Sequence, residues 1–188
     1  MNNDRILINK LKSFENINST FLNILLVLFG TLLLAISAKV QVPFWPVPMT
    51  MQTFVIFLIG MTYSIRLSFV TVAMYLFEGA AGLPVFASGG GIAYLTGPTA
   101  GYLYGMLFAS VVISYLANLG FSKTYFKATV SLFVGAILIF AFGIIYLGSI
   151  IGFEKAIVVG LLPFIPSEIF KIALAVTLIP TIQKVISK

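Results

Sequence analysis

Long apolar stretches separated by short polar ones run through almost the whole chain. A helix needs about 20 apolar residues to cross a bilayer, and somewhat fewer where neighbouring helices cover it. Six stretches meet this requirement, and we expect membrane-spanning helices at residues 20–38, 49–64, 66–82, 97–119, 126–148 and 155–183. The pattern therefore predicts an all-α, polytopic membrane protein in which residues 1–188 form a single membrane domain.

Charged residues alternate with Ile, Leu and Phe ahead of the first stretch, over residues 4–16. Helical spacing of this kind is typical of an amphipathic helix that lies on the membrane surface. At this length a disordered polar tail is the alternative. We accordingly divide the domain into a cytoplasmic or interfacial segment (1–19), a six-helix bundle (20–183) and a cytoplasmic tail (184–188).

The composition agrees with this class and excludes several functions. Hydrophobic residues make up 60% of the chain and charged residues only 9%, which is too apolar for a soluble domain. The chain has no Cys and no His, so disulfides, thiolate nucleophiles and the usual zinc sites are excluded. It also lacks a P-loop motif, and its spans hold too few acids for a paired-carboxylate site. We expect neither enzyme activity nor a bound metal or cofactor.

Lysine and arginine are distributed unequally between the two sides that six spans would create. Lys39 and Lys155 fall on one side, and Lys171 lies within the last span. The other side, which holds both termini, carries Arg5, Lys10, Lys12, Arg66, Lys123, Lys127, Lys184 and Lys188. Because cytoplasmic loops are enriched in Lys and Arg, this bias predicts that both termini are cytoplasmic.

The last apolar stretch contains two opposite charges, Glu168 and Lys171. A charge at membrane depth costs from about 3 to more than 10 kcal/mol, so such residues usually face the bundle interior and mark function. Their i, i+3 spacing places both on one face of a helix. Pro163 and Pro166 predict a break just before them, with Glu168 in the first turn of the new segment. Interrupted membrane helices often form the substrate sites of transporters, so Glu168 and Lys171 are candidates for ligand binding. The alternative is that the two residues form a structural ion pair that binds no ligand.

Two irregular segments and one acid fall on the outer side of the predicted bundle. Residues 39–48 contain three prolines with Phe44 and Trp45, and predict either a stiff lid over a cavity or an aromatic anchor among headgroups. Residues 79–102 carry seven glycines, and predict either a re-entrant loop that offers its backbone to a ligand or a flexible outer loop. Glu78 either lines the pocket or sits among the headgroups.

Three strings of residues make the chain recognisable, namely VPFWPVPMTMQTFVIFLIG (42–60), GLPVFASGGGIAYLTGPTAGYLYG (82–105) and PFIPSEIFKIALA (163–175). In combination they closely resemble the BioY family, the biotin-specific substrate-binding S components of energy-coupling factor transporters. The resemblance implies a six-helix protein of the bacterial cell membrane that captures biotin at the outer face for uptake. It also implies a transmembrane coupling subunit and two cytoplasmic ATPases as partners. The alternative is a stand-alone proton-coupled vitamin carrier, with Glu168 as the proton-binding group.

The resemblance also indicates which residues contact biotin. Glu168 and Lys171 match an acidic residue and a lysine that bind it in the family, although aspartate is the commoner acid there. Gln52 matches the family's glutamine and would contact either the ligand or another helix. If residues 39–48 form the lid described above, Phe44 and Trp45 would act as its gate. The resemblance further implies that the pocket is framed by Gly89, Gly90, Gly91, Gly97, Pro98, Thr99 and Tyr102. The bicyclic body of biotin also needs aromatic walls, for which Phe86, Tyr94, Tyr102 and Trp45 are the candidates.

A stripe of small residues follows the first predicted span. Its members are Gly30, Thr31, Ala35 and Ala38. Small side chains let two helix backbones approach closely. The stripe is therefore expected either to pack inside the bundle or, as the resemblance implies, to dock on the coupling subunit.

Overall fold

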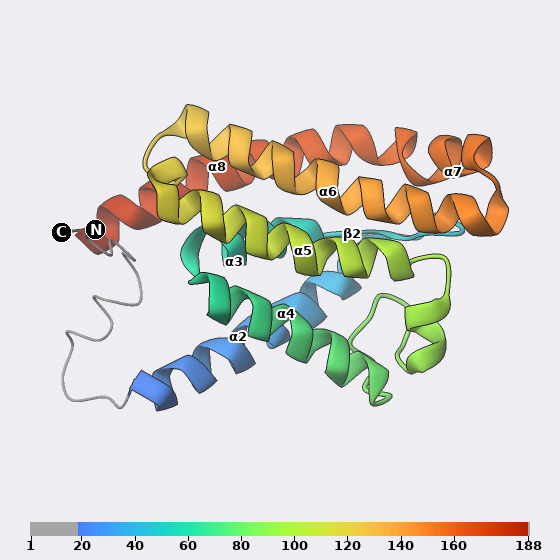
Figure 1. Ribbon diagram of the computed structural model, residues 1–188, viewed down its shortest axis with the longest axis horizontal. Coiled ribbons are helices and arrows are strands. Elements are labelled where there is room, and N and C mark those ends of the chain that lie inside the picture. The colour runs from blue at the N-terminus through green and yellow to red at the C-terminus, as the bar shows by residue number, and fades with distance from the viewer. Residues whose placement is uncertain (1–18, 188) are drawn as a thin grey trace.

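The computed structural model describes residues 19–187, and the side chains of residues 19–179. Helices make up most of this range (Figure 1). In chain order they are α2 (Ser19–Lys39), α3 (Gln52–Thr62), α4 (Ile65–Ala80), α5 (Ala100–Leu116), α6 (Tyr125–Ile151), α7 (Phe153–Gly160) and α8 (Ile165–Ser187). The predicted helical class is confirmed. The surface segment predicted at residues 4–16 lies outside the described part of the chain.

The helices coincide with the predicted apolar stretches, but they differ in length. Four are long and apolar enough to cross a membrane: α2, α5 with the π-turn that extends it to Phe121, α6, and α7 together with α8. By contrast, α3 has 11 residues and α4 has 16. At 1.5 Å per residue α3 spans only about 16 Å, roughly half of the hydrocarbon core. The chain is therefore a multi-pass membrane protein with two short helices within the bundle.

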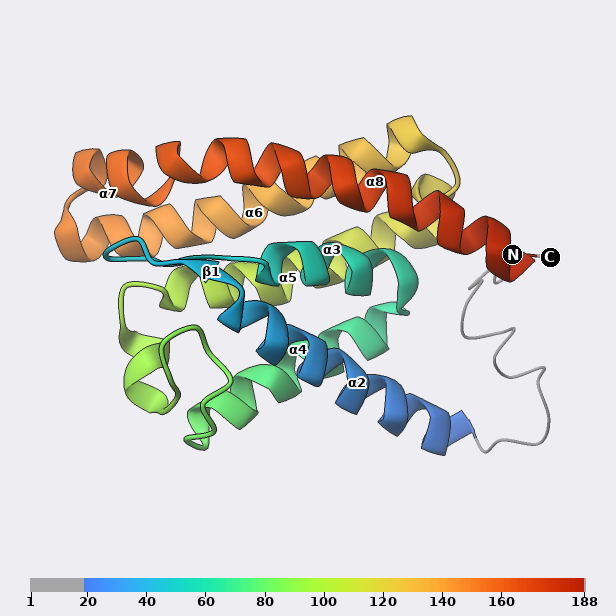
Figure 2. The same cartoon turned by 180° about the vertical axis from the view of Figure 1, so that it is seen from behind.

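The α5, α6 and α8 helices run along the long axis of the molecule, whereas α2 and α4 cross it obliquely, as Figures 1 and 2 show from opposite sides. At the centre lies α5, which contacts α6, α3 and α4. The α8 helix packs on α3 and α6, whereas α2 packs on α4 and α3. The start of α2 and the end of α8 lie at the same end of the molecule (Figure 1). We call this the inner end, and the opposite end, where α7 lies, the outer end.

Glycines bring three helices into close contact toward the inner end. Ile113 of α5 is fully buried between Gly60 of α3 and Gly135 of α6. A Cβ atom at either glycine would clash with the Ile113 side chain. Because interior close packing tolerates little added volume, these glycines set the spacing of the three helices.

Both irregular segments predicted from proline and glycine lie at the outer end, and each contains local structure. The proline-rich segment forms a hairpin in which β1 (Gln41–Val42) pairs antiparallel with β2 (Met49–Thr50). The glycine-rich segment contains a 3-10 turn, η1 (Ile92–Thr96). Gly89 and Gly91 have φ values of 134° and 100°, which favour glycine, so these residues shape the turns of the loop.

The small-residue stripe of α2 packs inside the bundle. Gly30, Thr31 and Ala38 are buried, and Ala35 is half-buried. Gly30 lies against Thr71 of α4, where a Cβ atom would clash. The burial of these residues agrees with the internal alternative, and docking on a coupling subunit stays a prediction. The face of α2 that remains exposed is lined by larger side chains, including those of Phe21, Leu25, Leu28, Leu32 and Ile36.

Candidate functional site

The predicted break in the last span is confirmed. The α7 helix ends at Gly160, a short 3-10 turn follows at η3 (Leu162–Phe164), and α8 begins at Ile165. The Phe164 amide bonds to the Leu161 carbonyl, 3.0 Å away, and so leaves the Gly160 carbonyl without its helical donor. The Tyr102 hydroxyl of α5 donates to that carbonyl at 2.8 Å. The break is thus fixed by a side chain, and it places Glu168 in the first turn of α8.

Glu168 and Lys171 form a buried cluster with a third residue, Thr53 of α3. The Lys171 ammonium lies 3.2 Å from Glu168 Oε2. The Thr53 hydroxyl donates to the same oxygen at 3.1 Å and accepts from Lys171 at 3.0 Å. The side chains of Glu168 and Lys171 are only 6% and 3% exposed. Two helices far apart in the sequence are therefore joined by one charged, hydrogen-bonded unit.

One oxygen of this cluster has no partner. Glu168 Oε1 is buried and makes no hydrogen bond, although a carboxylate oxygen is a strong acceptor. Leaving a buried charged group partly unsatisfied costs about 1–3 kcal/mol or more. A Lys171 ammonium has three donors, of which two are used within the cluster. The cluster therefore retains one free acceptor and one free donor that a polar ligand can satisfy.

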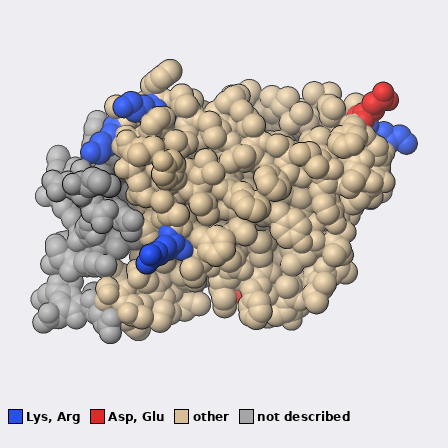
Figure 3. Space-filling model, in the orientation of Figure 1, with Lys and Arg blue, Asp and Glu red and all other residues tan. Residues whose placement is uncertain are grey.

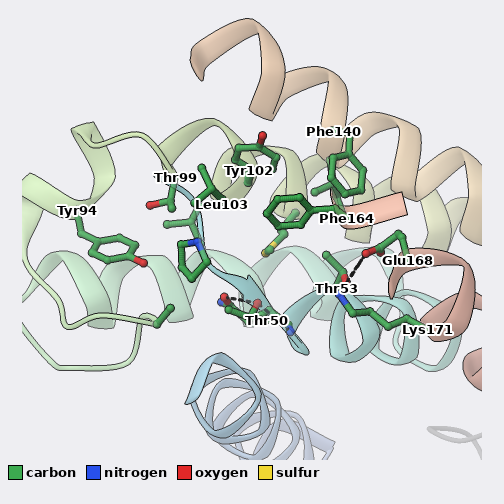
Figure 4. Close-up of a pocket in the computed structure, with 16 residues that line it drawn as sticks. Thr50, Thr53, Tyr94, Thr99, Tyr102, Leu103, Phe140, Phe164, Glu168 and Lys171 are labelled. Carbon is green, nitrogen blue, oxygen red and sulfur yellow. Dashed lines mark hydrogen bonds and ion pairs between the residues drawn. The ribbon is translucent and has the colours of Figure 1, made fainter. Parts of the chain in front are cut away.

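The cluster forms one end of a cavity in the outer half of the bundle (Figure 4). Side chains from the hairpin, the glycine-rich loop, α3, α5, α6, η3 and α8 all reach it. They are Val47, Pro48, Thr50, Gln52, Thr53, Ala87, Tyr94, Thr99, Tyr102, Leu103, Met106, Ile139, Phe140, Phe164, Glu168 and Lys171. Most are apolar, with polar groups concentrated in α3 and α8, which is the usual composition of a small-molecule site.

Aromatic rings form one wall of this cavity. The Phe164 ring stacks on Tyr102 with centroids 6.4 Å apart, and it meets Phe140 edge to face at 6.0 Å. Phe44, at the hairpin, lies 6.3 Å from Phe164. The hairpin is thereby held against the break between α7 and α8. Such a wall suits the flat face of an apolar ring system.

The structure brings six of the predicted pocket residues together around the cavity. These six are Gln52, Tyr94, Thr99, Tyr102, Glu168 and Lys171. Gln52 does more than line the wall, because it accepts from the Thr50 hydroxyl at 3.0 Å and donates to the Tyr75 hydroxyl at 2.7 Å. Its role in the site is therefore partly to connect the hairpin to α4.

The glycines and Pro98 do not line the cavity that holds the cluster. Gly90, Gly97 and Pro98 line a separate, more open hollow that shares Pro48, Tyr94 and Thr99 with the cavity. Gly89 and Gly91 line neither of the two. Their positive φ values shape the turn instead, and the loop residues that line the cavity are Ala87, Tyr94 and Thr99.

Three further candidates lie outside the cavity lining. Phe86 is 1% exposed and packs in the core between Tyr75 and Tyr94, because Gly79 leaves room for its ring. Glu78 is half-buried and lies outside the cavity lining. Trp45 is 86% exposed at the hairpin and lines a surface groove near α7.

Sequence reasoning missed Thr53, the residue that connects the two charges. A threonine in an apolar helix is ordinary, and its partners lie 115 and 118 positions away. It also missed the apolar walls that come from residues such as Met106 and Phe140. Among the described residues, no three side chains of the usual metal-ligating types come together.

A sequence model of the BioY family matches residues 10–188. The chain belongs to the BioY family. Its relatives include the probable biotin transporter BioY of Rickettsia prowazekii (strain Madrid E), which is 34% identical over 166 residues covering 88% of this chain and 85% of the relative. The biotin transporter BioY of Thermotoga maritima is 35% identical over 156 residues, which cover 82% and 91% of the two chains.

A solved structure agrees with this assignment. The crystal structure of the S component for biotin from an ECF-type ABC transporter superposes with a TM-score of 0.79 and 25% sequence identity. The match covers 90% of this chain and 95% of the other. The fold is therefore that of an S component of the BioY family, and the relatives are named as transporters rather than enzymes.

Proposed function

We propose that this protein binds biotin as the S component of an ATP-driven energy-coupling factor transporter and so serves biotin uptake. Membership of the BioY family supports the proposal, as do relatives named as biotin transporters. The observation that carries it is the buried cluster of Glu168, Thr53 and Lys171 at the end of an apolar cavity. Its unpartnered carboxylate oxygen is the acceptor that a ligand donor would satisfy.

The free groups of the cluster match the polar end of biotin. The ureido ring of biotin offers two N–H donors and one carbonyl acceptor. In our proposal, Glu168 Oε1 accepts from a ureido N–H, and the remaining donor of Lys171 reaches the ureido oxygen. Both hydrogen bonds would be charge-assisted, and bonds of this kind are shorter and stronger than neutral ones. The bicyclic body would then lie along the aromatic wall of Tyr102, Phe140 and Phe164.

The cavity is narrow, so access requires that one wall moves. Its volume is only about 40 Å³, whereas pockets that hold small molecules usually measure roughly 300–1,000 Å³. The hairpin supplies Val47, Pro48 and Thr50 to the lining and rests on Phe164 through Phe44. We propose that this hairpin swings outward to admit biotin, with Phe44 and Trp45 at its gating edge.

The charges support one orientation in the membrane. Arg66 lies at the start of α4, and Lys123 and Lys127 lie where α6 begins, all at the inner end. Glu154 and Lys155 lie in the first turn of α7, at the outer end. Figure 3 shows basic side chains toward the inner end and an acidic next to a basic side chain at the outer end. By the positive-inside rule the inner end would face the cytoplasm, the cavity would open outside, and the chain would cross six times.

The source of energy is also part of the proposal. The sequence has no P-loop motif, so ATP hydrolysis would come from two cytoplasmic ATPase subunits that act through a transmembrane coupling subunit. Uptake by reconstituted vesicles should then require these partners and ATP. Uptake by the chain alone in ATP-free vesicles, driven only by a pH gradient, would instead support a proton-coupled carrier.

Calorimetry of the purified protein in detergent tests the ligand. We expect biotin and desthiobiotin to bind, because both carry the ureido ring, and lipoate to give no binding heat, because it lacks that ring. Binding of lipoate as tight as that of biotin would contradict recognition through the ureido ring. Absence of binding by all three compounds would contradict the proposed function itself.

A further inference from the structure

Side-chain hydrogen bonds join the hairpin to the glycine-rich loop at the outer end. Gln41 of β1 donates to the Ala87 carbonyl at 3.3 Å. Gln52 donates to the Tyr75 hydroxyl, which donates to the Val85 carbonyl at 2.9 Å. Both loops line the cavity, the hairpin through Val47, Pro48 and Thr50 and the glycine-rich loop through Ala87, Tyr94 and Thr99. The two walls are therefore connected by contacts that lie outside the binding cluster.

The strongest of these connections comes from Lys39. This residue is in the last turn of α2, directly before the hairpin, and its ammonium donates to the backbone carbonyl of Phe86. The two residues are 47 positions apart. A charged donor makes a stronger hydrogen bond than a neutral one. Lys39 therefore does not project freely into the headgroups but fixes the base of the hairpin to the glycine-rich loop.

Phe86 is a suitable anchor because its ring cannot move freely. The ring is 1% exposed, stacks on Tyr94 with centroids 4.8 Å apart, and meets Tyr75 edge to face at 5.4 Å. On its other side it fills the space left by Gly79. Tyr94 in turn lines the cavity. The hydrogen bond to the Phe86 carbonyl therefore also restrains Tyr94, because the Phe86 ring stacks on this cavity residue.

We propose that Lys39 is a positioning residue that holds the hairpin and the glycine-rich loop together over the cavity and so slows the escape of bound ligand. The inference rests on the proposed function, since the ligand is taken to be biotin. Lys39 does not itself line the cavity. Its loss should therefore act mainly on the dissociation rate, whereas loss of Glu168 would remove a direct contact.

Two measurements on the full-length protein test this role. Lys39→Met keeps the length of the side chain and removes its donors, and should raise hydrogen exchange of residues 83–99 in the ligand-free protein. It should also speed biotin dissociation roughly tenfold or more, the range expected for a lost bond from a charged donor. Lys39→Arg retains donors, so its hydrogen exchange over residues 83–99 and its rate of biotin dissociation should equal those of the wild type. Lys127→Met, at an exposed inner-end lysine, is the matched control and should change neither.

The outcomes separate this inference from the proposed function. Unchanged exchange of residues 83–99 in Lys39→Met would overturn the connection between the loops. Faster exchange with unchanged biotin dissociation would overturn the positioning role. A wild-type protein that binds no biotin would contradict the proposed function, and the exchange comparison, which needs no ligand, would still decide whether Lys39 joins the loops.

Discussion

The inner and outer halves of the bundle are built from the same helices but packed in opposite ways. Toward the inner end, Ile113 of α5 fills the space between Gly60 of α3 and Gly135 of α6. Toward the outer end, the same three helices and α8 surround a cavity. Tight packing at the inner end fixes the helices relative to one another. The outer end can therefore contain a cavity that side chains do not fill.

Buried polar groups show the same contrast. In the inner half, the hydroxyls of Ser68 and Ser114 donate to the carbonyls of Ser110 and Tyr63 at 3.1 and 2.7 Å. Ser131 Oγ is buried there without a partner, but a neutral hydroxyl is much cheaper to bury than a charged carboxylate. In the outer half one oxygen of a carboxylate remains free. An unsatisfied carboxylate oxygen beside a cavity is therefore a better indicator of a binding site than an unsatisfied hydroxyl between packed helices.

The largest expected effect comes from filling the inner contact. Gly135→Leu would force a side chain into the space of Ile113, and overpacking of this kind should cost about 3 kcal/mol or more. We expect a marked fall in thermal stability in detergent. Ala141→Leu, on the exposed part of the same helix, is the control and should leave stability unchanged. If Gly135→Leu unfolds at the wild-type temperature, the inner contact does not fix the helices.

Thr53→Val should affect the outer half instead. Valine keeps the shape of threonine but removes the hydroxyl that connects Glu168 with Lys171. Leaving these charges under-satisfied should weaken biotin binding roughly 10- to 100-fold, since each such loss costs about 1–3 kcal/mol. Thr53→Ser retains the hydroxyl and should bind nearly as the wild type does. Equal affinity of the Val and Ser variants, measured by calorimetry, would show that the hydroxyl is unimportant.

A smaller difference is expected between two tyrosines at the two ends. Tyr102 donates to the Gly160 carbonyl at the helix break, and Tyr63 donates to the Leu26 carbonyl at the inner end, 2.9 Å away. Each Tyr→Phe change should cost about 1 kcal/mol of stability. Only Tyr102→Phe should also weaken biotin binding, by a few-fold, because the break orients α8. Equal binding by both variants would contradict that role.

Much of the fold could be predicted because the relevant signals are local. Apolar stretches give the helices, and Pro163 and Pro166 give the break before α8. The pair of Glu168 and Lys171 could be found because charges in an apolar stretch are costly and their spacing places them on one face. The second stretch is short already in the sequence, at residues 49–64, but α3 is shorter still, because Met49 and Thr50 continue the apolar pattern while they belong to β2.

The remaining parts of the site depend on contacts between distant segments. Thr53 lacks any local signal, since its role comes from α8. Phe86 turns into the core because Gly79 leaves a space for its ring, which no loop pattern reveals. The positive φ values of Gly89 and Gly91 agree with what a run of glycines predicts, but the sequence does not reveal that these two residues lie outside the cavity lining.

The most direct test of the account is the affinity of Glu168→Gln/Lys171→Met for biotin. This double variant removes both charges together, so no unpaired charge is left, and its stability should equal or exceed that of the wild type. Its affinity should fall by roughly 100-fold or more, because two charge-assisted bonds are lost. Glu154→Gln/Lys155→Met, an exposed outer pair of the same composition, should bind as the wild type does. Wild-type affinity in the Glu168/Lys171 variant would contradict the account.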